Sequence, residues 1–168
     1  MQPAEYWIEH LGLKPHPEGG YYRETYRASG QIPQSALPVQ FPGPRNYSTA
    51  IYFLLRANER SMLHRIKSDE LWHFHAGDPL TIYVLTESGV ISHNLGLNLH
   101  DGDQPQVYVP AKRWFGAMIN NGSYALASCT VAPGFDFADF EMGSRDQLLS
   151  DFPGNENLIT MLTPGQSK

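Results

Sequence analysis

The sequence of 168 residues has one cysteine, an excess of acidic over basic side chains and no long apolar run. Because Cys129 has no second cysteine to pair with, a disulfide within the chain is excluded, and the protein suits a reducing cytoplasm. The 17 acidic and 12 basic residues give a formal net charge of −5, which favours neither nucleic acid nor an anionic membrane as a partner. No apolar run approaches the roughly 20 residues that span a bilayer, and the first residues lack the basic and apolar parts of a signal peptide. We therefore expect a cytoplasmic protein.

The composition is that of a globular domain, with 41% hydrophobic and 12% aromatic residues. A chain of this length buries a substantial core as one unit, so we expect a single domain over residues 1–168. Cys129 lies in the apolar run 125–131. At that position a buried small hydrophobic side chain is favoured over a nucleophile.

The middle of the chain contains many short strand-like segments separated by turn signals. The predicted strands are residues 21–27, 47–56, 61–67, 71–74, 80–87, 89–95, 106–109, 114–119 and 124–131. Among the turns, Asn121-Gly122 favours a tight hairpin. Residues 28–44, rich in Pro, Ser and Gln, are predicted to form a loop that is either mobile or lies over an opening. Short strands at this spacing favour an antiparallel sandwich or barrel.

Short helices are predicted at both ends of the chain, over residues 3–11, 144–152 and 155–162. Ser144 and Gln147 have the spacing of a capping box at the start of the second helix. The fold class is therefore mainly β, with small helical additions at the termini.

The main signal for a functional site is one segment with three histidines and a glutamate. Residues 64–77 read HRIKSDELWHFHAG and contain His64, Glu70, His73 and His75. Histidine and glutamate are the side chains that bind metals or move protons near neutral pH. Their crowding therefore nominates a site.

The spacing within this segment resembles the first motif of the cupins, which are small double-sheet jelly-roll barrels. Gly77 follows Glu70 by seven residues, as in that motif, and His64 falls at the position of its first histidine. Ile66 stands at the position of the second histidine. Phe115 stands where a second cupin motif has its last histidine. Two of the four usual metal ligands of the cupins are therefore absent.

Longer phrases resemble one cupin family, Cupin_5, which is a domain of unknown function. They are Trp7-Ile8 with Leu11-Gly12-Leu13, and the stretches 16–22, 68–75 and 132–140. This resemblance covers nearly the whole chain. It implies an all-β fold, a double-stranded β-helix (jelly-roll, cupin) barrel with short helices at both termini. Because cupins commonly pair through sheet edges, it also implies a homodimer.

A weaker resemblance concerns chemistry. Residues 18–27, EGGYYRETYR, are similar to the opening strand of the dTDP-4-dehydrorhamnose 3,5-epimerases, which are also cupins. The similarity implies a metal-free histidine base in the strand that contains His64. The lysine that stabilises the enolate in those enzymes aligns with Glu70, whose charge has the wrong sign for holding an oxyanion. We therefore expect related proton-transfer chemistry rather than the same reaction.

Strand alternation constrains which side chains of this segment meet. Glu70, Trp72 and Phe74 share one face of a regular strand, and His73 and His75 share the other. If Glu70 points into the barrel, as the cupin resemblance implies, Trp72 and Phe74 line the interior beside it. The two histidines then face a second layer or a subunit interface, unless a bulge reverses the order.

The leading hypothesis is an uncharacterised cupin whose barrel pocket binds a small polar or sugar-like metabolite, with metal-independent isomerase or epimerase activity. His64 is the candidate base and Glu70 its partner. The candidate substrate-binding residues are Arg23, Tyr52, Trp72, Phe74 and Phe115. For Arg23 a surface ion pair, and for Tyr52 core packing, are the alternative roles.

Two further hypotheses stay open. No cofactor is favoured, but a divalent transition metal held by His64, Glu70 and either His73 or His75 would give a metal-dependent dioxygenase or isomerase. The third hypothesis is a non-catalytic module that binds a small molecule. Asp136 and Asp139 lie in an aromatic segment that is predicted either to form a lid or dimer contact or to cap a turn.

Overall fold

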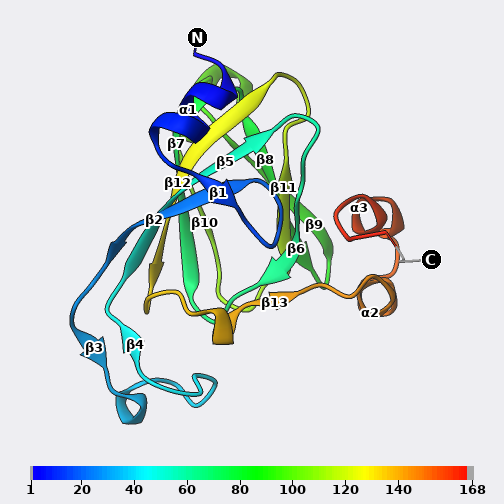
Figure 1. Ribbon diagram of the computed structural model, residues 1–168. Helices are drawn as coiled ribbons and strands as arrows, with labels where there is room; N and C mark the ends of the chain where they lie inside the picture. Colours follow the sequence, from blue (N-terminus) through cyan, green and yellow to red (C-terminus); the bar gives the residue numbers. More distant parts are fainter. Residues whose placement is uncertain (1, 166–168) are drawn as a thin grey trace.

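The computed structural model describes residues 2–165, which form two antiparallel sheets packed face to face as a jelly roll (Figure 1). The strand order of the larger sheet is β1 (Lys14–Pro15), β2 (Tyr21–Arg27), β5 (Thr49–Arg56), β12 (Tyr124–Ala132), β7 (Asp69–Gly77) and β10 (Gln106–Val109). The order of the smaller sheet is β13 (Glu141–Met142), β6 (Ser61–Arg65), β11 (Phe115–Met118), β8 (Leu80–Thr86) and β9 (Gly89–Leu95). The all-β prediction is thus confirmed. The predicted single domain also includes Met1 and residues 166–168, which lie outside the described residues.

The strands follow the apolar segments of the sequence. β2, β9 and β10 have the predicted bounds. β7 is longer than the predicted strand 71–74, because its backbone pairs with β12 on one side and with β10 on the other. β10 pairs only with residues 70–73, whereas β12 pairs along residues 69–77 and so holds the polar residues near the two ends in the strand.

The turn at Asn121-Gly122 does not close a hairpin, contrary to the prediction. β11 pairs with β6 and β8 in the smaller sheet, whereas β12 pairs with β5 and β7 in the larger one. The turn therefore carries the chain from one sheet to the other. Gly122 adopts a φ of 125°, and the backbone N–H of Ser123 donates to the carboxylate of Asp78 at 2.6 Å.

The helices are α1 (Ala4–His10), α2 (Arg145–Asp151) and α3 (Glu156–Met161), each one residue shorter at both ends than predicted. Ser144 is the N-cap of α2, but its hydroxyl makes no capping hydrogen bond, and Gln147 donates to Asp151 at 2.7 Å instead. The capping box is therefore wrong, because the side chain of Gln147 bonds within its own helix. Within residues 2–165, none of the helices has the length and apolar character needed to cross a bilayer.

Three apolar clusters hold these elements together. The inner core lies between the two sheets and includes Phe53, Trp72 and Phe115, each 1% exposed. Burying one such side chain contributes on the order of 1.5–3 kcal/mol. α1 packs on the outer face of the larger sheet, and α2 with α3 on the smaller sheet, as Figure 1 shows at the top and right.

Residues 28–44, predicted as a loop, form most of an arm that extends from the barrel at the lower left of Figure 1. Its short strands are β3 (Gln31–Ile32) and β4 (Arg45–Asn46), with the 3-10 turn η1 (Gln34–Ala36) between them. No residue of 28–44 lines the cavity described below. The arm is therefore not part of the wall of the opening.

Candidate functional site

A cavity of about 520 Å³ occupies one end of the jelly roll. Ionisable groups lie in its wall at His16, Glu18, His64 and Glu70, with aromatic groups at Tyr22, Phe53, Trp72, Phe135, Phe137 and Phe140. Charged side chains also line it at Lys14, Arg23, Glu24, Arg27 and Asp136, and smaller or aliphatic ones at Thr49, Ile51, Ile66, Cys129 and Val131. A volume of this order is typical of a small-molecule site, which usually measures roughly 300–1,000 Å³.

Four of the residues predicted from the sequence line this cavity: Arg23, His64, Glu70 and Trp72. His64 lies on β6 in one sheet, and Glu70 and Trp72 lie on β7 in the other. His64 and Glu70 therefore reach the same cavity from opposite sheets. Arg23 is exposed and makes no ion pair among the described residues, so a surface ion pair is not its role here.

The other three candidate binding residues lie outside the cavity lining. Phe115 packs behind His64, with the two ring centroids 4.2 Å apart. Phe74 packs against the inner core farther along β7. Tyr52 faces the opposite side of the larger sheet, in the cluster beneath α1. For Tyr52, the packing role is therefore the one that the structure shows.

His73 and His75 lie on the outer side of β7, as strand alternation predicts. Nε2 of His73 is 3.3 Å from Oγ1 of Thr130 on the neighbouring strand β12. His75 is exposed overall, but part of its ring is covered by the protein. This partial burial and the nearby His73 lower its pKa. A bulge leaves His75 without a pairing partner between Phe74 and Ala76, but it comes after Glu70 and Trp72. The inward direction of those two side chains is therefore unchanged.

His64 is 2% exposed, and both of its ring nitrogens have partners in the protein. Nδ1 donates to the carbonyl oxygen of Met62 at 2.7 Å, and Nε2 lies 3.1 Å from Oε2 of Glu18. Because a carbonyl oxygen only accepts, the proton of a neutral His64 sits on Nδ1. The contact between Nε2 and Glu18 then requires a further proton, which the two side chains share.

Glu18 is the functional candidate that sequence reasoning missed. Its carboxylate accepts a hydrogen bond from the hydroxyl of Ser61 at 2.8 Å, and Oε2 lies 3.5 Å from Nδ1 of His16. Gly19 and Gly20, which follow it, have positive φ values of 110° and 72°. A Cβ atom on Gly19 would overlap the carbonyl of Arg60, so only glycine lets the loop approach this closely. The two consecutive glycines were the available signal.

Burial sets the protonation of these groups. It raises the pKa of Glu70 to about 7; the nearby His64 opposes this rise, and the carboxylate of Glu18 adds to it. Burial also raises the pKa of Glu18, against the effects of His16 and Ser61, and lowers that of His64, against the effect of Glu70. Near neutral pH, Glu70 therefore exists in both its protonated and ionised forms.

Cys129 is buried, as predicted, and belongs to the inner core. It also lines the cavity, as Glu70 does. Burial raises the pKa of this thiol well above its usual value, and the carboxylates of Glu70 and Glu18 add to the rise. The cysteine therefore stays a thiol and acts as a neighbour of Glu70 rather than as a nucleophile.

The donor set of the cavity does not fit the four-ligand metal site of the cupin motifs. Among residues 2–165, no group of three His, Cys, Asp or Glu side chains is arranged to hold an ion. Ile66 lines the cavity at the position of the second cupin histidine, and Phe115 packs on His64 at the position of the last. His73 and His75 lie on the other face of the sheet. No cofactor is established.

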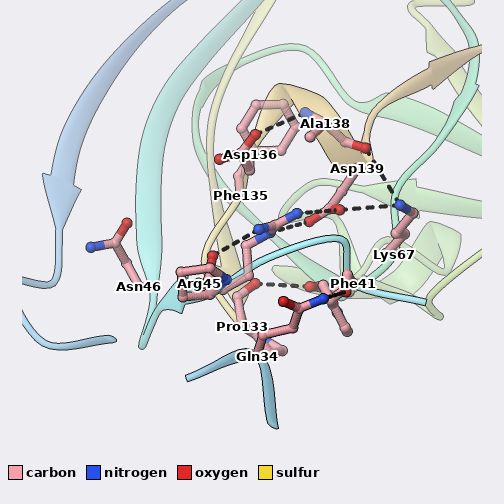
Figure 2. Close-up of polar contacts among 12 residues, drawn as sticks. Gln34, Phe41, Arg45, Asn46, Lys67, Pro133, Phe135, Asp136, Ala138 and Asp139 are labelled. Atoms are coloured by element: carbon pink, nitrogen blue, oxygen red, sulfur yellow. Dashed lines mark hydrogen bonds and ion pairs between the residues drawn. The ribbon is translucent and has the colours of Figure 1, made fainter. Parts of the chain in front are cut away.

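Residues 133–140 carry part of the aromatic wall and are fixed by a buried ion pair (Figure 2). The guanidinium of Arg45 donates to both carboxylate oxygens of Asp139, at 2.6 and 2.7 Å, and both side chains are about 5% exposed. Lys67 lies 3.4 Å from the same carboxylate. Asp136 accepts from the backbone N–H of Ala138 at 2.8 Å and so caps a 3-10 turn, η3 (Phe137–Asp139). The turn-capping alternative is therefore the one observed for Asp136.

A jelly roll whose open end gathers a histidine and carboxylates from facing sheets defines a barrel of the cupin class. Comparison with protein families gives the same class and a narrower assignment. The Cupin_5 family, described as "Cupin superfamily (DUF985)", matches residues 5–143. The chain belongs to this family.

Individual relatives match most or nearly all of the chain. A hypothetical protein from Leishmania major is 34% identical, covers 98% of this chain and 100% of its own, and superposes with a TM-score of 0.89. Protein SO0799 from Shewanella oneidensis is 39% identical, covers 99% and 100%, and superposes with a TM-score of 0.87. The uncharacterised protein YML079W of Saccharomyces cerevisiae is 27% identical over 157 residues, which are 86% of this chain and 77% of that protein. None of these descriptions names a substrate.

Proposed function

We propose that this cupin binds a small polar, sugar-like metabolite in the barrel cavity and acts on it as a metal-independent isomerase or epimerase. The observation that carries the proposal is the burial of Glu18, His64 and Glu70 around one cavity with aromatic walls. Burying ionisable groups is costly for folding. Groups with strongly shifted pKa values gather at functional sites, where the shift serves proton transfer.

Glu70 is the group that we assign to proton transfer with the ligand. The sequence-based hypothesis gives this role to His64, but both ring nitrogens of His64 already have protein partners. Glu70 lines the cavity, and a pKa of about 7 lets its carboxyl both take and return a proton at neutral pH. His64 and Glu18 hold their shared proton beside it.

The proposed step moves a proton and needs no co-reactant. The ionised carboxylate of Glu70 removes a proton from a carbon next to a carbonyl group, and the electron pair of that C–H bond moves toward the carbonyl oxygen. The enolate then takes a proton back at carbon, which restores the carbonyl. A proton that water delivers to the opposite face inverts the carbon. Where the deprotonated carbon carries a hydroxyl group, a proton returned to the former carbonyl carbon, with transfer of the hydroxyl proton to the former carbonyl oxygen, gives the isomer.

The test begins with a thermal-shift screen of sugars, sugar phosphates and sugar acids, because binding to the folded state raises the melting temperature. Compounds that bind are then incubated in deuterated water, and deuterium at carbon is measured by NMR. We expect Glu70→Gln to slow this exchange by about 100-fold or more, the usual size of a general acid–base contribution.

The matched control is Glu87→Gln, the same chemical change at an exposed position in the turn between β8 and β9. It should exchange as fast as the wild type. A wild-type protein that binds compounds in the cavity without exchanging any proton would contradict the catalytic proposal and favour the non-catalytic module. The homodimer and the cytoplasmic location stay predictions, which light scattering and cell fractionation can test.

A further inference from the structure

Trp72 carries a hydrogen-bond donor that the protein does not use. Its side chain is 1% exposed and lines the cavity, two residues beyond Glu70 on the same face of β7. In the part of the chain that the structure describes, Nε1 of Trp72 is the buried side-chain polar atom without a hydrogen-bond partner. By contrast, Nε1 of Trp7 donates to the hydroxyl of Tyr124 at 2.8 Å. A buried N–H left unpaired is costly, so an oxygen of a ligand is the partner that it fits.

Among the described residues of the cavity wall, two carboxyl groups occupy buried positions, whereas two unpaired cations occupy exposed ones. The buried carboxyl groups belong to Glu18 and Glu70, whereas Lys14 and Arg23 are exposed. Among residues 2–165, neither of these cations lies within ion-pair distance of a carboxylate. A negatively charged part of a ligand is therefore repelled by the buried carboxylates and attracted to the exposed cations.

The remaining charged groups of the wall are already engaged with one another or with the backbone. Arg27 donates to both oxygens of Glu24, at 3.0 and 2.7 Å. Asp136 accepts from the backbone of Ala138. Lys14 lies over the ring of Tyr22, with Nζ 5.3 Å from the ring centre, a contact that leaves its charge available to an anion.

We infer that the ligand is a hydroxy-carbonyl compound of about monosaccharide size with one anionic group. Trp72 donates its indole N–H to the carbonyl oxygen, and Lys14 and Arg23 hold the phosphate or carboxylate at the exposed side of the cavity. The inference rests on the proposed function. When Glu70 removes the neighbouring proton, negative charge develops on that oxygen, and a donor already in place stabilises it.

The first experiment follows the indole N–H signals of the ¹⁵N-labelled wild-type protein by NMR during titration with fructose 6-phosphate and 2-ketogluconate, which carry a phosphate and a carboxylate. Trp72→Phe assigns the Trp72 signal, and Trp7 and Trp114, which do not line the cavity, serve as internal references. We expect the Trp72 signal alone to shift with at least one compound. Glucitol 6-phosphate, which lacks the carbonyl, should leave it in place. No shift with either anionic carbonyl compound would overturn the inference.

The second experiment compares affinities. Trp72→Phe keeps an aromatic ring without the N–H and should bind the carbonyl compound about tenfold more weakly, the usual size of one lost hydrogen bond. Lys14→Gln and Arg23→Gln should weaken binding of the anionic compound but not of neutral fructose. Arg113→Gln, an exposed position outside the cavity, is the matched control. Equal affinity of Trp72→Phe and the wild type would overturn the role of the indole.

The two proposals fail in different ways. If the wild type and Trp72→Phe bind and exchange the proton equally well, the proposed function stands and this inference is wrong. If the Trp72 signal shifts with the carbonyl compounds but Glu70→Gln exchanges as fast as the wild type, the ligand class stands and proton transfer by Glu70 is wrong. The chain has three tryptophans, so Trp7→Phe and Trp114→Phe also assign the Trp72 signal by elimination. A folding defect in Trp72→Phe therefore leaves the NMR test intact.

Discussion

The two ends of the jelly roll are built from the same strands but filled in opposite ways. Along the inner face of β7, Glu70 lines the cavity, Trp72 follows with its unpaired N–H, and Phe74 packs against the inner core. On the filled side, Leu80 and Leu95 close the space with side chains at most 1% exposed. One end therefore supplies packing energy, and the other holds buried ionisable groups that cost energy. The packing energy of the filled end therefore offsets the cost of burying ionisable groups at the cavity end.

The largest expected loss of stability is at the anchor of residues 133–140. Asp139→Asn leaves the buried guanidinium of Arg45 without its counter-charge, which typically costs about 3–5 kcal/mol. Urea unfolding measures it, and Glu141→Gln, which loses a partly exposed pair with Arg65, is the control and should cost at most about 1 kcal/mol. Equal losses of unfolding free energy in the two variants would show that the buried pair stabilises the protein no more than the exposed one.

The filled end should be almost as sensitive to truncation. Leu95→Ala removes a side chain that is 0% exposed in the inner core, and such changes cost about 2–5 kcal/mol because a cavity remains. The same unfolding assay measures the loss. Leu97→Ala, at a site 63% exposed, is the matched control and should stay within about 0.5 kcal/mol of the wild type. A small loss at Leu95 would contradict the close packing of this end.

At the open end, removing a charge should increase stability. Since the pKa of Glu70 rises from 4.5 to about 7 on folding, its contribution to stability is present below about pH 4.5 and is lost as the pH rises through 7. At 1.36 kcal/mol for each pKa unit, the loss is about 3 kcal/mol.

Glu70→Gln should therefore be more stable than the wild type above pH 7, with the difference growing between pH 4.5 and 7. Urea unfolding at several pH values measures this difference. His64, whose pKa is lowered, contributes stability above pH 6.5 that is lost as the pH falls. Because Glu70 raises the pKa of His64, the difference between the two proteins contains the loss of Glu70 together with the resulting change in His64. A difference that does not change with pH would refute the shifted pKa.

The sequence predicted the strands better than it predicted the site. Local patterns determine the bounds of β2, β9 and β10. Motif spacing and strand alternation predicted that His64, Glu70 and Trp72 lie at the cavity. Tyr52 could not be placed, because β5 is covered by α1 on one side and by the inner core on the other, which removes the alternation. Glu18 was missed because it meets His64 only through a glycine-dependent loop, 46 positions away in the sequence.

The smallest effect on stability is expected at Phe137, which lines the cavity with 52% of its surface exposed. Its ring lies 6.3 Å from that of His16 and packs edge-on to Phe135. Phe137→Ala should change the free energy of unfolding by less than about 1 kcal/mol, since little buried area is lost. It should nevertheless weaken ligand binding several-fold, because the aromatic wall loses contact area.

Phe140→Ala, on the same segment but less exposed, should lose more stability. Unchanged affinity in Phe137→Ala would mean that the ligand lies deeper, against Trp72 and Glu70. The exposed edge of the cavity would then take no part in binding.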